Sequence, residues 1–322
     1  MIAWLVVLQT TLTIGVSGPA TNPEYWPLHL AAAEGYFAEE KLAVSLEANR
    51  AEAGAAEALS RGRVALAATS LDAALELGHV GGLPPRLVFG LTATPAVALL
   101  VPAVQKDSIR SLADLVGKTI GVPAPGTPEH HVLISLLARA GIKIPQVTVQ
   151  SYGELGLAGA LESGKVAAGV LGDPYATRLV EAGKAGPLVD LRKRGEAARW
   201  LGELAVHAAI FARADTALGP AEIKPLVRAL LRATSRVENA TPEEMRARFP
   251  AATVGFPEDF RARLYGAREI FLRDGRVSAE MLDASVALVR NRSSIPARVK
   301  LPRKMDGLLL TGPLEEVLGA RR

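Results

Sequence analysis

The chain contains one structural unit twice, and this repeat limits what it can fold into. "TIGVSGPATNPEYWPLHLAAAEG" begins at Thr13, and "TIGVPAPGTPEHHVLISLLARAG" begins at Thr119. Each copy runs from a β-like segment, through a Pro-rich loop, into an apolar helical stretch that ends in Gly. A strand–loop–helix unit that occurs twice predicts two similar lobes. Three residue pairs align at a single offset: Thr13 with Thr119, Thr21 with Thr127, and Gly35 with Gly141.

A second repeat supports duplication. "ALSRGRVALAATSLDAA" from Ala58 resembles "ALESGKVAAGVLGDPYA" from Ala160. In both segments a helix ends at Gly, a basic residue follows, a strand of small residues runs on, and a polar turn opens the next helix. Two repeats in the same order are stronger evidence than one short strand motif. We therefore expect lobe 1 to comprise residues 12–98 and 207–322, and lobe 2 to comprise residues 99–206.

Strand and helix patterns alternate along roughly the first two hundred residues, as in an α/β fold with largely parallel sheets. The segment "LAVHAAIFARAD" is expected to be a strand that crosses back from lobe 2 to lobe 1. From Pro220 onward the pattern is helical, because each segment starts with Pro, Thr or Ser followed by carboxylates. We expect this C-terminal tail to pack outside the sheets.

Composition and charge exclude several classes of protein. The 322 residues are 49% apolar, which suits a packed globular protein too long for one ordinary core. The net charge is +4, and the densest basic cluster, "RKRGEAAR" from Arg192, is interpreted as a solvated loop. No nucleic-acid partner is expected, since such a site needs a wider basic face with stacking aromatic rings. The absence of cysteine excludes disulfides, a thiol nucleophile, Cys-ligated metals and a lipoprotein anchor.

The N-terminal segment allows two interpretations. "MIAWLVVL" is apolar, too short to span a bilayer, and has no basic region before it. It is either the tail of a signal peptide or an extension of the first strand. We treat residues 1–11 as a residual signal-like segment.

Ligands of open α/β sheets bind beyond the carboxyl ends of the strands, so two facing lobes would form a cleft there. Residues just after the predicted strands, together with His207, are therefore the ligand-binding candidates. In the first lobe these are Ser17, Asn22, Tyr25, Trp26, Thr69, Ser70, Thr92 and Thr94, and in the second they are Gly126, Thr127, His130, Asp173 and Tyr175.

The segment "PGTPEHHVL" carries the most information about binding. Thr127 suits a helix N-cap, Pro128 the first helical position and Glu129 the first turn. Free N–H groups and the helix dipole at such an end favour an anion or a polar acceptor. Gly126 would let the ligand approach the backbone. The segment is not a phosphate-binding Walker loop, since no Gly-Lys-Ser/Thr follows at the required spacing.

Several candidates have an ordinary structural alternative. Tyr25 and Trp26 could form a hydrophobic staple over the first helix, and Asp173 could cap the helix that follows it. The strand-end hydroxyls could simply be satisfied within the fold. Adjacent histidines on a helix point apart, so His130 and its neighbour are not expected to hold a metal. No catalytic constellation is visible, and no cofactor is expected.

Four segments resemble the solute-binding proteins of nitrate/sulfonate/taurine-type ABC transporters, whose superfamily includes binders of thiamine-pyrimidine precursors. They are "YWPLHLAAAEGYFAEEKLAVSLE", "GRVALAATSLDAAL", "SLADLVGKTIGVPAPGTPEHHVL" and "ALESGKVAAGVLGDPYATRL". The resemblance covers about residues 12–215. It implies a two-lobed periplasmic-binding-protein fold of type II, with two similar α/β lobes, two hinge strands and a helical C-terminal tail. Gly126, Thr127, His130, Asp173 and Tyr175 match the second-lobe loops that touch ligand in this family.

The resemblance also implies a function. It implies a periplasmic, monomeric protein that captures a solute by Venus-flytrap closure and delivers it to a membrane permease driven by an ATPase. The candidates include many hydroxyls and no Lys or Arg, so we expect a small organic solute with a polar or anionic head. Pro128 lacks one N–H donor, which counts against sulfonate or nitrate. The alternative is a cofactor-independent enzyme on the same fold, such as a lyase of menaquinone biosynthesis; the superfamily's cysteine-dependent enzymes do not fit.

The signal-like segment yields the first prediction. The product of the full-length gene, with any in-frame extension upstream, should be recovered outside the cytoplasm when cells are fractionated. A protein that stays in the cytoplasm would contradict this expectation.

Overall fold

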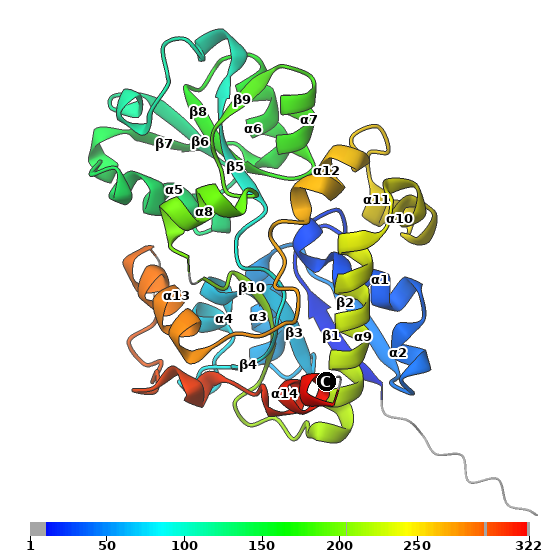
Figure 1. Cartoon of the computed structure of the whole chain (residues 1–322). Helices are drawn as coiled ribbons and strands as arrows, with labels where there is room; N and C mark the ends of the chain where they lie inside the picture. Colours follow the sequence, from blue (N-terminus) through cyan, green and yellow to red (C-terminus); the bar gives the residue numbers. More distant parts are fainter. Residues whose placement is uncertain (1–10, 204, 293–294, 321–322) are drawn as a thin grey trace, which may run out of the picture.

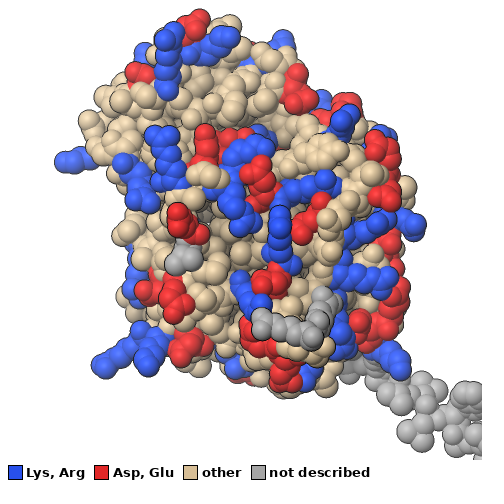
Figure 2. Space-filling model, viewed as in Figure 1, with Lys and Arg blue, Asp and Glu red and all other residues tan. Residues whose placement is uncertain are grey.

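The computed structural model describes residues 11–203, 205–292 and 295–320 (Figure 1). The predicted signal-like segment, residues 1–11, therefore lies outside the described residues except at its last position. Basic and acidic side chains are interspersed over the face shown in Figure 2, so neither sign forms a broad patch on that face.

The described residues form two five-stranded sheets. The first has the order β2-β1-β3-β10-β4 and the second β7-β6-β8-β5-β9. The first comprises β1 (Leu12–Val16), β2 (Val44–Ala48), β3 (Leu66–Ser70), β4 (Arg86–Gly90) and β10 (Ala208–Ala212). The second comprises β5 (Val97–Pro102), β6 (Thr119–Val122), β7 (Thr148–Ser151), β8 (Ala168–Gly172) and β9 (Ala185–Asp190).

The two copies of "TIGV" are β1 and β6, and they occupy the same place in separate sheets. The predicted two-lobed α/β fold is thus confirmed. Figure 1 shows the first sheet in the lower part of the molecule and the second in the upper part. The exact boundaries of the lobes, residues 12–98 with 207–322 and residues 99–206, stay a prediction.

The expectation of largely parallel sheets holds for strand direction, since four of the five strands in each sheet run the same way, but each sheet also contains one antiparallel strand. Strand β1 is parallel to β2 and β3, but β10 is antiparallel to both of its neighbours, β3 and β4. The second sheet repeats this arrangement, with β6 parallel to β7 and β8 and β5 antiparallel to β8 and β9. Strands β5 and β10 both arrive from the other lobe. They therefore begin at the edge of the sheet where the parallel strands end.

Helices cover both sheets, and the C-terminal tail packs outside them as expected (Figure 1). Helix α9 packs along α1, α2 and α14, while α13 contacts α5 of lobe 2. In lobe 1 lie α1 (Trp26–Ala33), α2 (Tyr36–Glu39), α3 (Glu52–Ser60) and α4 (Leu71–Leu77). In lobe 2 lie α5 (Pro128–Arg139), α6 (Gly153–Glu162), α7 (Tyr175–Glu181) and α8 (Arg194–Leu201). The tail contains α9 (Pro220–Asn239), α10 (Pro242–Arg248), α11 (Ala251–Val254), α12 (Phe260–Ala267), α13 (Ala279–Arg292) and α14 (Gly312–Gly319).

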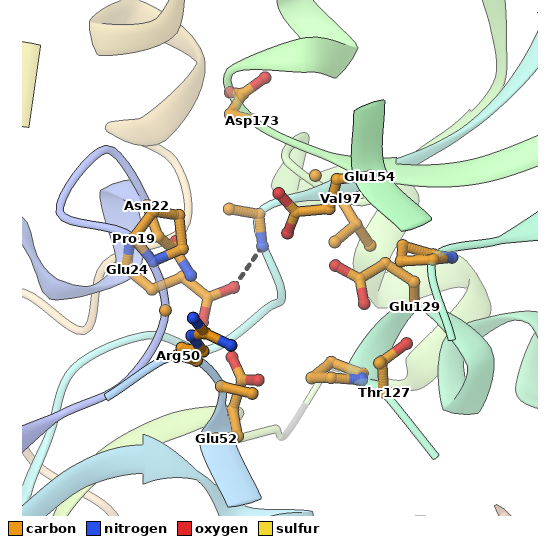
Figure 3. Close-up of a pocket in the computed structure, with 16 residues that line it drawn as sticks. Pro19, Asn22, Glu24, Arg50, Glu52, Val97, Thr127, Glu129, Glu154 and Asp173 are labelled. Atoms are coloured by element: carbon orange, nitrogen blue, oxygen red, sulfur yellow. Dashed lines mark hydrogen bonds between the residues drawn. The ribbon is translucent and has the colours of Figure 1, made fainter. Parts of the chain in front are cut away.

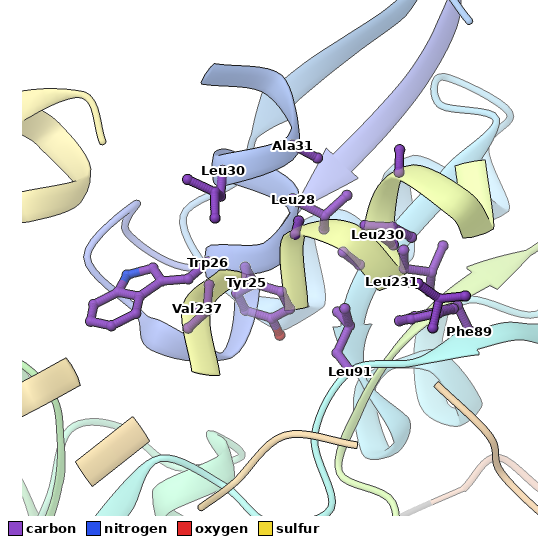
Figure 4. Close-up of a cluster of buried hydrophobic side chains, with 14 of the residues drawn as sticks. Tyr25, Trp26, Leu28, Leu30, Ala31, Phe89, Leu91, Leu230, Leu231 and Val237 are labelled. Carbon is purple, nitrogen blue, oxygen red and sulfur yellow. The ribbon is translucent and has the colours of Figure 1, made fainter. Parts of the chain in front are cut away.

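Trp26 packs in the hydrophobic core that lobe 1 shares with the C-terminal tail (Figure 4). The indole is fully buried, and its ring centroid lies 5.5 Å from that of Phe249 and 5.4 Å from that of Phe260. Tyr25 is also fully buried in this cluster. Burial of side chains this large stabilises the fold by about 2–3 kcal/mol each. Of the two roles that the sequence allows for Trp26, the structure supports the one in the core.

A buried ion pair connects lobe 1, lobe 2 and the tail. The Arg292 guanidinium of α13 donates to both carboxylate oxygens of Asp72 in α4, at 2.9 and 2.7 Å. His131 of α5 approaches the same carboxylate, with Nδ1 3.5 Å from Oδ1. Burial by itself would raise the pKa of Asp72, but Arg292 and His131 outweigh it and hold that pKa well below its usual range.

Loss of Arg292 should destabilise the protein strongly. Arg292→Ala would leave Asp72 buried without its main counter-ion, which costs about 3–5 kcal/mol of the free energy of unfolding. Because the folded-state pKa of Asp72 is depressed, this contribution is present above about pH 4 and is lost as the pH falls further. Urea denaturation at pH 7 measures the effect, with Arg290→Ala on the exposed face of α13 as the control. Equal losses in the two variants would contradict the prediction.

Candidate ligand-binding cleft

A cleft lies between the two sheets, where parallel strands of both lobes end (Figure 3). Loops and helix starts that follow β1, β2, β6, β7 and β8 contribute to its walls, as does the link from β4 to β5. Its lining consists of Gly18, Pro19, Asn22, Glu24, Arg50, Ala51, Glu52, Ala96, Val97, Pro123, Thr127, Pro128, Glu129, Glu154, Gly172 and Asp173.

Only some of the predicted binding residues reach this cleft. Asn22, Thr127 and Asp173 line it, while Ser70 and Gly126 line an adjoining cavity that Thr127 shares. The remaining candidates lie outside the linings of both cavities, and they are Ser17, Tyr25, Trp26, Thr69, Thr92, Thr94, His130, Tyr175 and His207.

Two of the hydroxyls outside the cleft have structural partners. Thr69 Oγ1 donates to the carbonyl oxygen of Glu52 at 3.0 Å, which fixes the start of α3. Thr92 Oγ1 accepts from the backbone N–H of Ala208 at 3.2 Å, where the chain returns to the first sheet. The ordinary alternative, a hydroxyl satisfied within the fold, therefore describes both residues.

Thr127 caps α5 as predicted. Its Oγ1 accepts from the backbone N–H of His130 at 3.5 Å and donates to the carbonyl oxygen of Ala124 at 3.0 Å. Gly126 has a φ of +78°, a conformation that favours glycine. The Gly126 N–H donates to the Nδ1 atom of His130 at 3.1 Å, so this helix end is already partly satisfied by its own side chains.

Asp173 caps a helix, as one of its two predicted roles requires, and its contact with a ligand stays a prediction. Its Oδ1 accepts from the backbone N–H of Thr177 at 2.9 Å, which caps the first turn of α7, and Asp173 also lines the cleft. The Arg192 guanidinium donates to the same oxygen at 3.1 Å and to Asp190 Oδ1 at 2.8 Å. The interpretation of the Arg192 cluster as a solvated loop is wrong at this residue. Arg192 is buried, because two carboxylates supply the partners that burial of a charge requires.

The main feature of the cleft is a set of four glutamate carboxyl groups, and none of them is among the predicted binding residues. Figure 3 shows Glu24 and Glu52 of lobe 1 opposite Glu129 and Glu154 of lobe 2, with all four side chains directed toward one space. Each stands in or next to the first turn of a helix that follows a strand. First-turn carboxylates also signal helix starts, which is the role predicted for Glu129. Glu24, Glu52 and Glu154 are absent from the predicted binding residues.

Burial and neighbouring carboxylates shift the pKa values of several groups in and beside the cleft. Burial raises the pKa of Glu52 to about 8, and the carboxylates of Glu129 and Glu24 add to the effect. Burial likewise raises the pKa of Glu129 and that of Glu154. Burial would lower the pKa of His207, but Glu24, whose Oε2 lies 3.5 Å from Nε2, outweighs it and raises that pKa. Glu24 Oε1 accepts from the backbone N–H of Ala96 at 2.7 Å, on the link between the lobes.

A model of the family described as "NMT1/THI5 like" matches residues 22–244. The chain belongs to this family. A curated relative, the riboflavin-binding protein RibY of Chloroflexus aurantiacus, is 31% identical over 138 residues. That match covers 41% of this chain and only 37% of the relative.

Solved structures share the fold. The alkanesulfonate-binding protein SsuA of Xanthomonas axonopodis pv. citri, bound to MOPS, has a TM-score of 0.69 at 21% identity, over 94% of this chain and 98% of that chain. The nitrate-binding protein NrtA of Synechocystis PCC 6803 also has a TM-score of 0.69, at 14% identity, over 97% of this chain and 89% of that chain. At these identities the likeness extends to the periplasmic-binding-protein fold alone. Within the described ranges, no helix has the length and apolar character needed to cross a bilayer.

Glu52 should make the stability of the protein depend on pH. Its folded-state pKa of about 8 exceeds its ordinary value of 4.5. The folded state therefore loses stability as the pH rises from about 4.5 to about 8, where Glu52 must ionise in the cleft. Thermal unfolding at pH 5, 7 and 9 should show this loss in the wild type and a smaller loss in Glu52→Gln. Glu47→Gln, at an exposed position on β2, should match the wild type. An identical pH dependence of stability in all three proteins would contradict the raised pKa of Glu52.

Proposed function

We propose that this chain is the extracytoplasmic substrate-binding component of an ABC importer. It captures a small polar organic solute between its lobes and delivers it to a membrane permease and its ATPase. The observation that carries the proposal is the cleft at the facing ends of the two sheets, with polar side chains from both lobes in its lining. The names of relatives that share the family or the fold support it, since they are binding proteins for riboflavin, alkanesulfonate and nitrate.

The geometry suits capture by closure. Asn22 contributes from lobe 1, and Thr127 and Asp173 contribute from lobe 2, so a solute between them would contact both lobes at once. Such a solute favours the closed arrangement over the open one, because only the closed arrangement offers both sets of contacts. An anionic head suits this lining poorly. Among the described residues of the lining, five carry carboxyl groups and Arg50 alone carries a guanidinium.

One observation favours a second candidate, a cofactor-independent enzyme on the same fold. Burial raises the pKa of Glu52 to about 8, which brings a carboxyl group into the range useful for general acid–base catalysis. Incubation of a bound solute with the protein, followed by mass spectrometry, separates the two candidates. A transport protein returns the solute unchanged, whereas an enzyme converts it.

Filling the cleft should abolish binding. A Cβ atom at Gly172 would lie 3.5 Å from Glu129 Oε1, so the longer side chain of Gly172→Leu would extend into the space between the lobes. The matched control is Gly186→Leu on β9, where a Cβ atom would meet nothing within 4 Å. A thermal-shift screen of sulfonates, nitrate, pyrimidines, carboxylates and amines identifies a ligand, and calorimetric titration then compares the variants. Wild-type affinity in a folded Gly172→Leu protein would exclude this cleft as the binding site.

Thr127 should contribute modestly to affinity. Thr127→Ala removes a hydroxyl from the lining and the cap from α5, which together cost about 1 kcal/mol, or a several-fold loss of affinity. The control is Thr148→Ala at an exposed position of lobe 2, which should bind like the wild type. Calorimetric titration of the same ligand measures both. Unchanged affinity in Thr127→Ala would remove the α5 N-terminus from the site.

A further inference from the structure

We propose that the solute is a small organic cation with N–H groups, held by carboxyl groups from both lobes. The inference rests on the proposed function, because it names the class of ligand for the same cleft. It replaces the expectation of an anionic head with the opposite charge.

Three carboxyl groups of the cleft have no counter-ion among the described residues. Glu52 of α3 faces Glu129 of α5 and Glu154 of α6 across the cleft (Figure 3). Across the part of the chain that the structure describes, none of the three forms an ion pair with Lys, Arg or His. The other two acidic residues of the lining do have such partners, Glu24 with His207 and Asp173 with Arg192. These three carboxyl groups without a counter-ion therefore face the space between the lobes.

Two buried carboxylate oxygens of the lining provide independent support for a ligand that carries hydrogen-bond donors. Glu24 Oε2 and Asp173 Oδ2 are buried and have no hydrogen-bond partner among the described residues. Both side chains are more than nine-tenths buried, and both residues line the cleft. A carboxylate oxygen is only an acceptor, so Asp173 Oδ2 can take a donor from a ligand, while Glu24 Oε2 already lies 3.5 Å from His207 Nε2. The cleft thus offers hydrogen-bond acceptors together with carboxyl groups that have no counter-ion.

The lining also selects among cations. Its described residues include no aromatic ring, whereas quaternary ammonium groups are usually held by aromatic cages. A bare metal ion is disfavoured, because no three His, Cys, Asp or Glu residues of the described ranges are placed to hold one. An ammonium, amidinium or guanidinium group satisfies the requirement, since it brings positive charge and N–H donors in one group.

Binding of a cation should release a proton. Glu52 faces Glu24 and His207 from lobe 1 and Glu129 from lobe 2, and Arg50 and Glu154 share the lining. With the pKa of Glu52 raised to about 8, its carboxyl is mostly protonated at pH 7 in the free protein. A bound cation favours the ionised carboxylate. Affinity should therefore increase from pH 7 to pH 9, in contrast to the behaviour expected for an anion.

The test uses three solutes that share a four-carbon chain and differ in their ends. Calorimetric titration compares 1,4-diaminobutane, 1,4-butanediol and butane-1,4-disulfonate, with agmatine as a guanidinium probe and choline as a cation without N–H groups. We expect binding of 1,4-diaminobutane or agmatine, and no binding of choline or the disulfonate. Titration in phosphate and in Tris at pH 7 should give different apparent enthalpies, because protons released by the protein are taken up by the buffer.

Isosteric variants test the residues. Glu52→Gln and Glu129→Gln should each weaken binding of the amine about tenfold or more, since each removes a charged acceptor. Glu52→Gln should also abolish proton release. Glu47→Gln on β2 is the matched control and should keep wild-type affinity.

The outcomes separate the inference from the proposed function. If no amine or guanidinium binds while a neutral or anionic solute of the screen does, the inference is overturned and the proposed function stands. If no solute of any charge binds the folded protein, both are overturned. Amine binding that survives both glutamate substitutions would also overturn the inference.

Discussion

The direction in which the chain enters each sheet determines the rest of the structure. Strands β5 and β10 come from the opposite lobe, so they must begin at the edge where the parallel strands end. This requirement turns the carboxyl ends of both sheets toward each other. The helices that follow the parallel strands then start at the same place, and their first turns form the walls of the cleft. The site is thus a consequence of connectivity as much as of any single residue.

Facing helix starts explain the charge of the cleft. Carboxylates are favoured in the first turn of a helix, where they complement the dipole and cap free N–H groups. In one lobe alone, Glu52 or Glu129 would be an ordinary first-turn carboxylate that stabilises its own helix. When the two lobes face each other, their carboxyl groups occupy the same space and repel one another. A feature that stabilises each helix locally therefore produces a strongly acidic site between the lobes.

The repeats in the sequence were enough to predict two lobes, and the N-cap at Thr127 followed from local rules. The residues that line the cleft were harder to predict. Strand-end hydroxyls such as Thr69 and Thr92 were plausible by position, but they are used inside the fold. Trp26 is buried because α12 and its neighbours, more than two hundred residues later, cover it. Arg192 is buried because Asp173 and Asp190 meet it in space. Each of these outcomes depends on tertiary contacts that no local pattern encodes.

Glu24 contacts both connections between the lobes and also lines the cleft. One of its oxygens holds the backbone of Ala96 on the link between the lobes, while the residue itself forms part of the cleft wall. Its other oxygen lies beside His207, where the chain passes between the lobes a second time. A single carboxyl group thus contacts both connections between the lobes and the wall of the cleft. If the chain captures a solute as proposed, a change in the charge or orientation of Glu24 would act directly on both connections, without a relay through the cores of the lobes.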